Sequence, residues 1–183
     1  MADQDASNPN NGGAPEQDAQ IAAITQYIKD LSVESPNSPT VFQWQVQPKV
    51  DVQFSINVNR IADEVHEVVL RVAVDAKSEN GAHFLVDLSY AGLFGVRNVP
   101  DEALGPFLLV EAPRLIFPFA RQVIAEAVQN SGFPPLLLEP IDFGAAFIQQ
   151  LEMQQAQQGS EGGNGAGGNG SGQELPPGDD NQA

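Results

Sequence analysis

The side chains that most often bind metals or act as nucleophiles are few in this chain, and their spacing favours neither role. The two histidines, His66 and His83, fall on strand-like stretches with no carboxylate at a recognisable ligand spacing. The absence of cysteine excludes disulfides, thiolate nucleophiles and cysteine metal sites. No serine stands in a nucleophile-elbow context, and no two carboxylates stand out as an acid–base couple. We therefore expect a protein that is not an enzyme and has no metal site.

Two matches to known motifs near the C-terminus carry no chemistry by themselves. The glycine pattern of dinucleotide-binding folds occurs at residues 163–168, but it follows no predicted strand and opens no predicted helix. A glycosylation sequon occurs at residues 169–171, in a chain that nothing directs to a glycosylating compartment. We interpret both as accidents of a tail rich in glycine and asparagine.

A group of apolar side chains in loops or on thin secondary structure could bind another protein. The group consists of Val41, Phe42, Trp44, Leu136, Leu137, Leu138, Phe143 and Phe147. Two interpretations stay open from the residues alone. The side chains either complete the core or together line a long apolar groove at the edge of the fold.

A group of acidic side chains forms the second candidate surface. If Asp30, Ser32 and Glu34 share one side of a strand, alternation lets Leu85 and Asp87 share that side on another strand. Such a face is either simply solvated or a docking site, and the residues alone leave both interpretations open.

The charge of the chain divides it into three parts. Eight basic and 24 acidic side chains give a net charge of -16, which argues against nucleic-acid binding because phosphate backbones are held by clustered Lys and Arg. Residues 1–20 and 157–183 contain acids but no base, and their Gly, Asn, Gln and Pro cannot offset the entropy of ordering. We expect two disordered tails around a domain at residues 21–156, which is long enough for a core.

The sequence also predicts the compartment. No apolar run approaches the roughly 18 residues of a membrane span, and the N-terminus is acidic where a secretory signal would be basic. We expect a soluble cytoplasmic protein that does not insert into the membrane.

Alternation of apolar and polar side chains predicts a four-stranded antiparallel sheet. The predicted strands span residues 24–34, 50–58, 65–77 and 83–90. Asn80-Gly81 favours a tight turn between the last two, because these residues readily supply positive φ angles. Short links between strands are typical of an antiparallel sheet with one covered face.

After Gly95 the apolar spacing becomes helical. Residues 100–102 suit a helix start, residues 114–130 form an apolar-faced helix ended by Ser131-Gly132, and Pro118 either opens or kinks that helix. The proline-rich residues 133–140 predict an extended crossing segment. A last helix begins with Asp142 as N-cap and presents Phe143, Phe147 and Leu151 on one face. The predicted class is therefore α+β, with helices packed on one face of the sheet.

Four segments resemble the SecB family of bacterial protein-export chaperones. They are Tyr27-Ile28-Lys29-Asp30-Leu31-Ser32-Val33-Glu34-Ser35-Pro36-Asn37-Ser38-Pro39, Ala62-Asp63-Glu64-Val65-His66-Glu67-Val68-Val69-Leu70-Arg71-Val72, Ile116-Phe117-Pro118-Phe119-Ala120-Arg121, and Phe133-Pro134-Pro135-Leu136 through Phe143 and Phe147. They follow one another in the family's order between about residues 24 and 155. The resemblance implies a homotetramer, built as a dimer of dimers, that binds unfolded precursor proteins and hands them to the SecA motor without ATP or a cofactor.

The resemblance also implies roles for the two candidate surfaces. The SecA contact of the family falls on Asp30, Glu34, Leu85 and Asp87. The client groove would be lined by Phe42, Trp44, Leu136, Leu138, Phe143 and Phe147. An alternative keeps the same fold and groove in a chaperone dedicated to one partner, such as an antitoxin, whose SecA face is free to drift.

Overall fold

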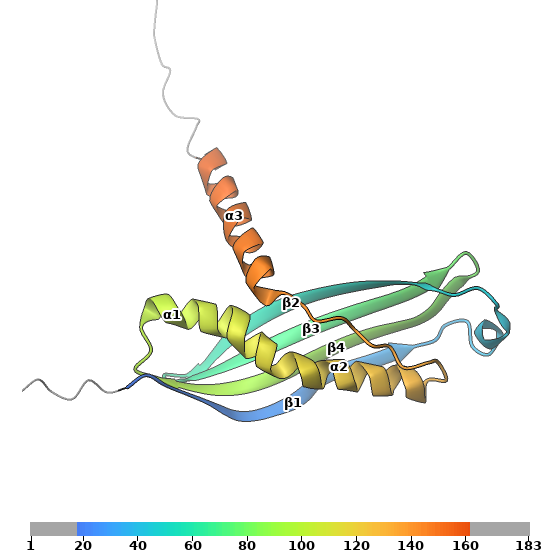
Figure 1. Cartoon of the computed structure of the whole chain (residues 1–183), viewed down its shortest axis with the longest axis horizontal. Helices are drawn as coiled ribbons and strands as arrows, with labels where there is room; N and C mark the ends of the chain where they lie inside the picture. Colours follow the sequence, from blue (N-terminus) through green and yellow to red (C-terminus); the bar gives the residue numbers. More distant parts are fainter. Residues whose placement is uncertain (1–17, 162–183) are drawn as a thin grey trace, which may run out of the picture. The chain divides into compact units, whose positions relative to one another are not determined.

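A computed structural model describes residues 18–161, without the side chains of Gln150 and residues 154–161. Its sheet has four antiparallel strands in the order β1-β4-β3-β2 (Figure 1). The strands are β1 (Gln20–Glu34), β2 (Lys49–Ala62), β3 (Val65–Ser78) and β4 (Gly81–Arg97), and a short 3-10 turn, η1 (Thr40–Gln43), links the first two. The prediction of a four-stranded antiparallel sheet is confirmed.

The alternation of β3 and β4 builds the core. These two strands are central in the sheet, and their even-numbered apolar side chains are buried. They include Val68, Leu70, Val72, Val74, Phe84, Val86 and Leu88. The predicted β3–β4 turn is present, with Gly81 at a φ of +129°. β4 runs seven residues beyond the predicted end. The prediction was too short because Ala91, Gly92 and Gly95 interrupt the apolar alternation, although they do not break the strand.

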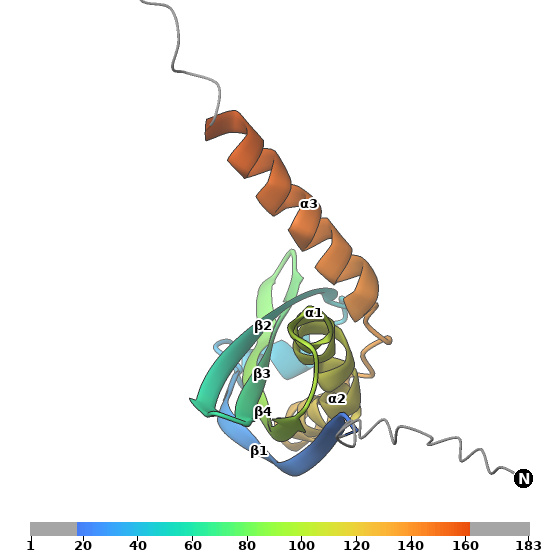
Figure 2. The same ribbon diagram turned by 90° about the vertical axis from the view of Figure 1, so that its left-hand side faces the viewer.

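One long helical stretch covers one face of the sheet, as Figure 2 shows. It consists of α1 (Asp101–Pro106), a π-helical turn η2 (Phe107–Glu111) and α2 (Ala112–Asn130). The side chains of α2 in the core are Ala112, Ile116, Phe117, Ala120, Ile124 and Val128. Gly92 lets α2 approach β4 closely, because a Cβ at this position would lie 2.9 Å from Ile116 Cγ2.

One helical stretch has the length and mean hydropathy of a membrane span, although Glu111, Arg114 and Arg121 interrupt its apolar residues and no apolar run approaches 18 residues. Residues Asp101–Asn130 are continuous over 30 residues and reach a mean hydropathy of 1.4 in an 18-residue window. Core helices of soluble proteins meet the same criterion, and one side of α2 lies in the core. Pro118 lies inside α2 and does not open it.

The chain after α2 is extended, as predicted. Gly132, at a φ of +90°, follows the end of α2, and residues 134–142 contain no regular element. α3 (Phe143–Glu161) then begins with Asp142 as its N-cap, since Asp142 Oδ1 accepts a hydrogen bond of 3.0 Å from the Ala145 amide. Residues up to Phe147 belong to one compact unit and those from Ile148 to another.

The strand and helix bounds overlap the predicted tails slightly. β1 already includes Gln20, and α3 extends to Glu161. Apart from these overlaps and residues 18–19, the predicted tails lie outside the described residues, as do the motif matches at residues 163–168 and 169–171.

Candidate functional site

The strand register brings the predicted docking residues onto one face of the sheet. Glu34 pairs with Leu85, Ser32 pairs with Asp87, and Asp30 pairs with Ser89. Directly paired residues of adjacent strands point to the same side, and successive residues of one strand to opposite sides. The four predicted residues therefore share the face opposite α2.

The same face continues over β3 and β2 with two acids that sequence reasoning missed. Leu85 pairs with Asp75, and Asp75 pairs with Asp51, so one row of residues crosses all four strands. We call the set Asp30, Glu34, Asp51, Asp75, Leu85 and Asp87 the acidic face. The alternation at residues 50–58 already placed Asp51 opposite its apolar neighbours, but only the pairing of β2 with β3 locates it beside Asp75.

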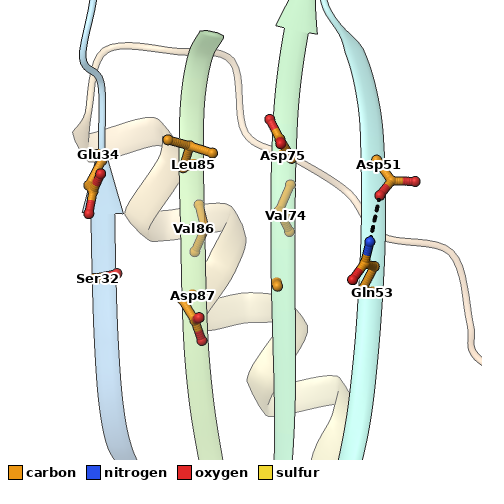
Figure 3. A pocket seen from close by; sticks show the side chains of 10 residues that line it. Ser32, Glu34, Asp51, Gln53, Val74, Asp75, Leu85, Val86 and Asp87 are labelled. Carbon is orange, nitrogen blue, oxygen red and sulfur yellow. Dashed lines mark hydrogen bonds between the residues drawn. The ribbon is translucent and has the colours of Figure 1, made fainter. Parts of the chain in front are cut away.

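A hollow of about 380 Å³ lies on this acidic face, and Figure 3 shows its lining side chains. Glu34, Leu85 and Asp75 lie along one end of the hollow, each on a different strand. The lining also includes two residues with short side chains, Ser32 and Ala73. The hollow thus offers carboxylates around a small depression, an arrangement that suits a basic side chain of a partner.

Two basic side chains of β3 already contact carboxylates of the acidic face. Arg71 binds Asp87 through both oxygens, with 2.9 Å between Nε and Oδ1, and Lys77 pairs with Asp75. The hydrogen bond from Arg71 lowers the pKa of Asp87, and the same contact raises the pKa of Arg71. Within residues 18–161, neither Glu34 nor Asp30 forms an ion pair.

A buried carboxylate network on the same side of the sheet was not predicted. Glu67 is only 5% exposed and accepts hydrogen bonds from Lys29, at 2.8 and 2.9 Å, from Tyr27 and from Asn59. Hydrogen bonds from Lys29, Tyr27 and Asn59 lower the pKa of Glu67 to about 2. A register shift between Ile28 and Asp30 interrupts the alternation of β1 here, which explains why this strand is noisy in sequence.

Apolar hollows lie on the other side of β2, next to the extended segment 133–141. One hollow of about 550 Å³ is lined by residues that include Phe42, Trp44, Phe133 and Leu136. A second, also about 550 Å³, is lined by Val50, Val52, Phe54 and residues 136–141. The two hollows share Val50 and Leu136, so we treat them as one apolar groove.

The predicted groove residues do not all occupy equivalent places. Phe42, Trp44, Leu136 and Leu138 line the groove. Phe143 is buried at 1% exposure, and its ring meets Phe54 and Phe117 edge to face, so it supports the groove from within the core. Phe147 is half-buried and does not line either hollow. The roles of these residues in client binding stay predictions.

Three groove residues come from β2 and were not singled out in the sequence. Val50, Val52 and Phe54 are each 37–38% exposed, although strand alternation places them on the covered side of the sheet. They remain exposed because β2 is an edge strand, whereas α2 packs mainly on the central strands β4 and β3. The sequence signal for these three residues was the complete alternation at residues 50–58. It predicts which face of the strand they occupy, but it does not predict that no helix covers this face completely.

The extended segment is fixed to α2 by one polar contact. Arg121 Nη1 donates a hydrogen bond of 3.2 Å to the Leu138 carbonyl oxygen. Aromatic contacts hold its start, since Phe133 lies 5.2 Å from Phe42 and 5.0 Å from Phe84 between ring centroids. The wall of the groove is thus positioned by the core behind it.

The histidines are part of the packing. His66 and His83 are both buried, and His83 meets the Trp44 ring edge to face at 5.0 Å while its Nε2 lies 2.9 Å from Ser78 Oγ. Among the residues that the structure describes, no three His, Cys, Asp or Glu side chains form a group able to hold a metal ion.

These features define a class of protein. A single antiparallel sheet carries the acidic face on one side and the apolar groove on the other, which is the arrangement of a protein that binds other polypeptides.

Comparisons with known proteins give the family. The family model of SecB, the preprotein translocase subunit, matches residues 14–155. The protein-export protein SecB of Sphingopyxis alaskensis is 52% identical over 88% of this chain and 96% of its own length. That of Zymomonas mobilis is 50% identical over 81% of this chain and 88% of its own. The chain belongs to the SecB family of protein-export chaperones.

A solved structure agrees with this fold. The SecB-like chaperone of Mycobacterium tuberculosis, determined in complex with an antitoxin peptide, superimposes with a TM-score of 0.54. It is 18% identical in sequence, and the match covers 67% of this chain and 90% of that one. At this identity the likeness concerns the fold alone.

Proposed function

We propose that this chain is an ATP-independent holdase that binds unfolded precursor proteins in the apolar groove and delivers them to SecA through the acidic face. The observation that carries this proposal is the separation of the two surfaces on opposite sides of one sheet. A chaperone that must hold a client and contact a motor at once needs two surfaces that do not overlap. SecB relatives at about 50% identity support the export role.

The groove suits binding that does not depend on the shape of the client. An unfolded precursor exposes apolar side chains, and burying them contributes about 25 cal/mol per Å² of apolar surface. Phe42 is 52% exposed and Leu137 is 77% exposed, so much of the apolar surface along the groove remains open to solvent. Many weak contacts of this kind give affinity without selecting one sequence, and several protomers would add avidity.

The acidic face suits a basic partner. Asp30, Glu34, Leu85 and Asp87 form our proposed SecA contact, in which the carboxylates attract and orient a basic segment around one apolar side chain. The double variant Asp30→Lys with Glu34→Lys should lose SecA affinity and keep client affinity. Unchanged SecA affinity at low and high salt would contradict the docking assignment.

We also propose that the protein is a homotetramer, a dimer of dimers. On β1, an edge strand, Ile21, Ile28 and Leu31 are 38–48% exposed, and on α2 Leu115 and Phe119 are 54% and 47% exposed. Apolar side chains exposed together on one side of a sheet and its helix favour burial against further copies. Leu115→Asp with Phe119→Asp should lower the mass measured by light scattering.

We also propose that this protein needs few other components. We expect it to act in the cytoplasm, without catalysis, cofactor, nucleic acid or membrane insertion. Flotation with lipid vesicles tests the last point, since the helical stretch at Asp101–Asn130 has the length of a membrane span. A pull-down from cells separates the general export role, with many clients and SecA, from a chaperone dedicated to one antitoxin-like partner.

A further inference from the structure

One carboxylate of the proposed SecA contact is already occupied within the chain. Both oxygens of Asp87 accept hydrogen bonds from the Arg71 guanidinium, although Arg71 and Asp87 keep 60% and 32% of their side-chain surface exposed. A bidentate arginine–carboxylate pair has well-defined geometry and uses the carboxylate oxygens that an incoming cation would otherwise bind. A partner that reaches Asp87 therefore meets a pair and not a free anion.

The position of Arg71 in the sheet also brings it toward a second docking acid. Arg71 pairs with Ser89, and Ser89 pairs with Asp30, so the three residues form one row across β3, β4 and β1. Because the Ser89 side chain is short, no large side chain stands between Arg71 and Asp30 in this row. Asp30 adds to the electrostatic stabilisation of the Arg71 cation.

We infer that Arg71 is a built-in counter-cation of the acidic face, which weakens the docking of a basic partner and thereby keeps the docked complex reversible. The inference rests on the proposed docking of SecA to this face. A basic side chain that approaches Asp87 must displace the guanidinium or bind beside a like charge. Reversible docking is what a chaperone needs if it is to leave the motor after handing over a client.

The expected size of this effect is modest and depends on salt. Charges at an exposed surface interact weakly, and physiological salt screens them further. Removing the Arg71 charge should therefore tighten SecA binding about threefold at low ionic strength. The gain should fall toward zero in high salt, and the salt dependence of binding should become steeper.

The test is the SecA affinity of Arg71→Gln, measured with the full chain by titration calorimetry at ionic strengths of about 0.05 and 0.3 M. Arg71→Lys keeps the charge and loses the bidentate fork, so it should bind within about twofold of the unmodified protein. Arg60→Gln is the matched control, because Arg60 pairs with the fully exposed Asp63 near the β2–β3 turn and its loss changes the net charge equally.

The outcomes separate the inference from the proposed function. Tighter docking with Arg71→Gln alone supports the counter-cation role. Unchanged or weaker docking, or equal tightening by Arg71→Lys or Arg60→Gln, overturns it. If the double variant Asp30→Lys with Glu34→Lys still docks SecA, the proposed SecA contact itself is wrong. If the double variant does not dock SecA and Arg71→Gln has no effect, only the role of Arg71 is wrong.

Discussion

Asp51 and Val52 are neighbours on β2, yet their side chains line different hollows on opposite sides of the sheet. Asp51 belongs to the acidic face, whereas Val52 lines the apolar groove. Strand alternation alone produces this separation, since successive side chains point to opposite faces. A single edge strand thus contributes to both proposed binding surfaces.

This neighbour pair allows the two functions to be separated by adjacent substitutions. Val52→Asp should weaken capture of an unfolded precursor several-fold, because it places a charge in the apolar groove, and should leave SecA affinity unchanged. Asp51→Lys should do the opposite at low salt. Aggregation suppression and SecA titration measure the two effects. Loss of both activities in either variant would contradict separate surfaces.

Phe42 and Phe143 should respond differently to the same substitution. Phe42 is 52% exposed in the groove and contacts Phe133, so Phe42→Asp should reduce client capture and cost less unfolding free energy than the loss of a fully buried ring. Phe143 is buried between Phe54 and Phe117, so Phe143→Asp should destabilise the fold by about 3 kcal/mol or more. Urea unfolding distinguishes the two. Equal stability of the two variants would mean that Phe143 is not a core side chain.

Gly92 should not tolerate even one added methyl group. A Cβ there would lie 2.8 Å from Phe94 Cε2 and 2.9 Å from Ile116 Cγ2, so Gly92→Ala should cost about 1–3 kcal/mol of unfolding free energy. Gly95→Ala on the same strand is the control, because its Cβ would meet only ordinary contacts at 3.6 Å or more. Similar urea midpoints for the two variants would argue against close packing of α2 on β4.

Glu67 should make stability depend on acid pH. Its pKa is lowered to about 2 in the folded protein, so its contribution is present above the usual carboxyl pKa of 4.5 and is lost as pH falls from there toward 2. The contribution is roughly 1–2 kcal/mol, because its partner Lys29 is half exposed.

The comparison with Glu67→Gln isolates this contribution, since all other carboxylates are unchanged. The unmodified protein should lose more unfolding free energy than the variant between about pH 5 and pH 2.5. Parallel losses would show that the network with Tyr27, Lys29 and Asn59 does not stabilise the ionised carboxylate.

The periodicity of apolar residues was sufficient to predict the main strands and helices and the faces that they present. It was insufficient to predict which residues of different elements contact one another. Asp30, Glu34, Leu85 and Asp87 could be grouped from alternation, with the family resemblance supplying their role. Asp75 and Asp51 required the β3–β2 register, which no local pattern contains. The burial of Phe143 required the position of Phe54 on a strand about ninety residues earlier, so a helical pattern could not separate a core side chain from a groove side chain.

The central claim is that one molecule holds an unfolded precursor and SecA at the same time on opposite sides of its sheet. Light scattering of the chain alone, with a reduced unfolded precursor, and with precursor and SecA together measures this directly. We predict that the mass rises at both additions. A mass that does not change with precursor, or SecA binding that releases the precursor in equal amount, would contradict the account.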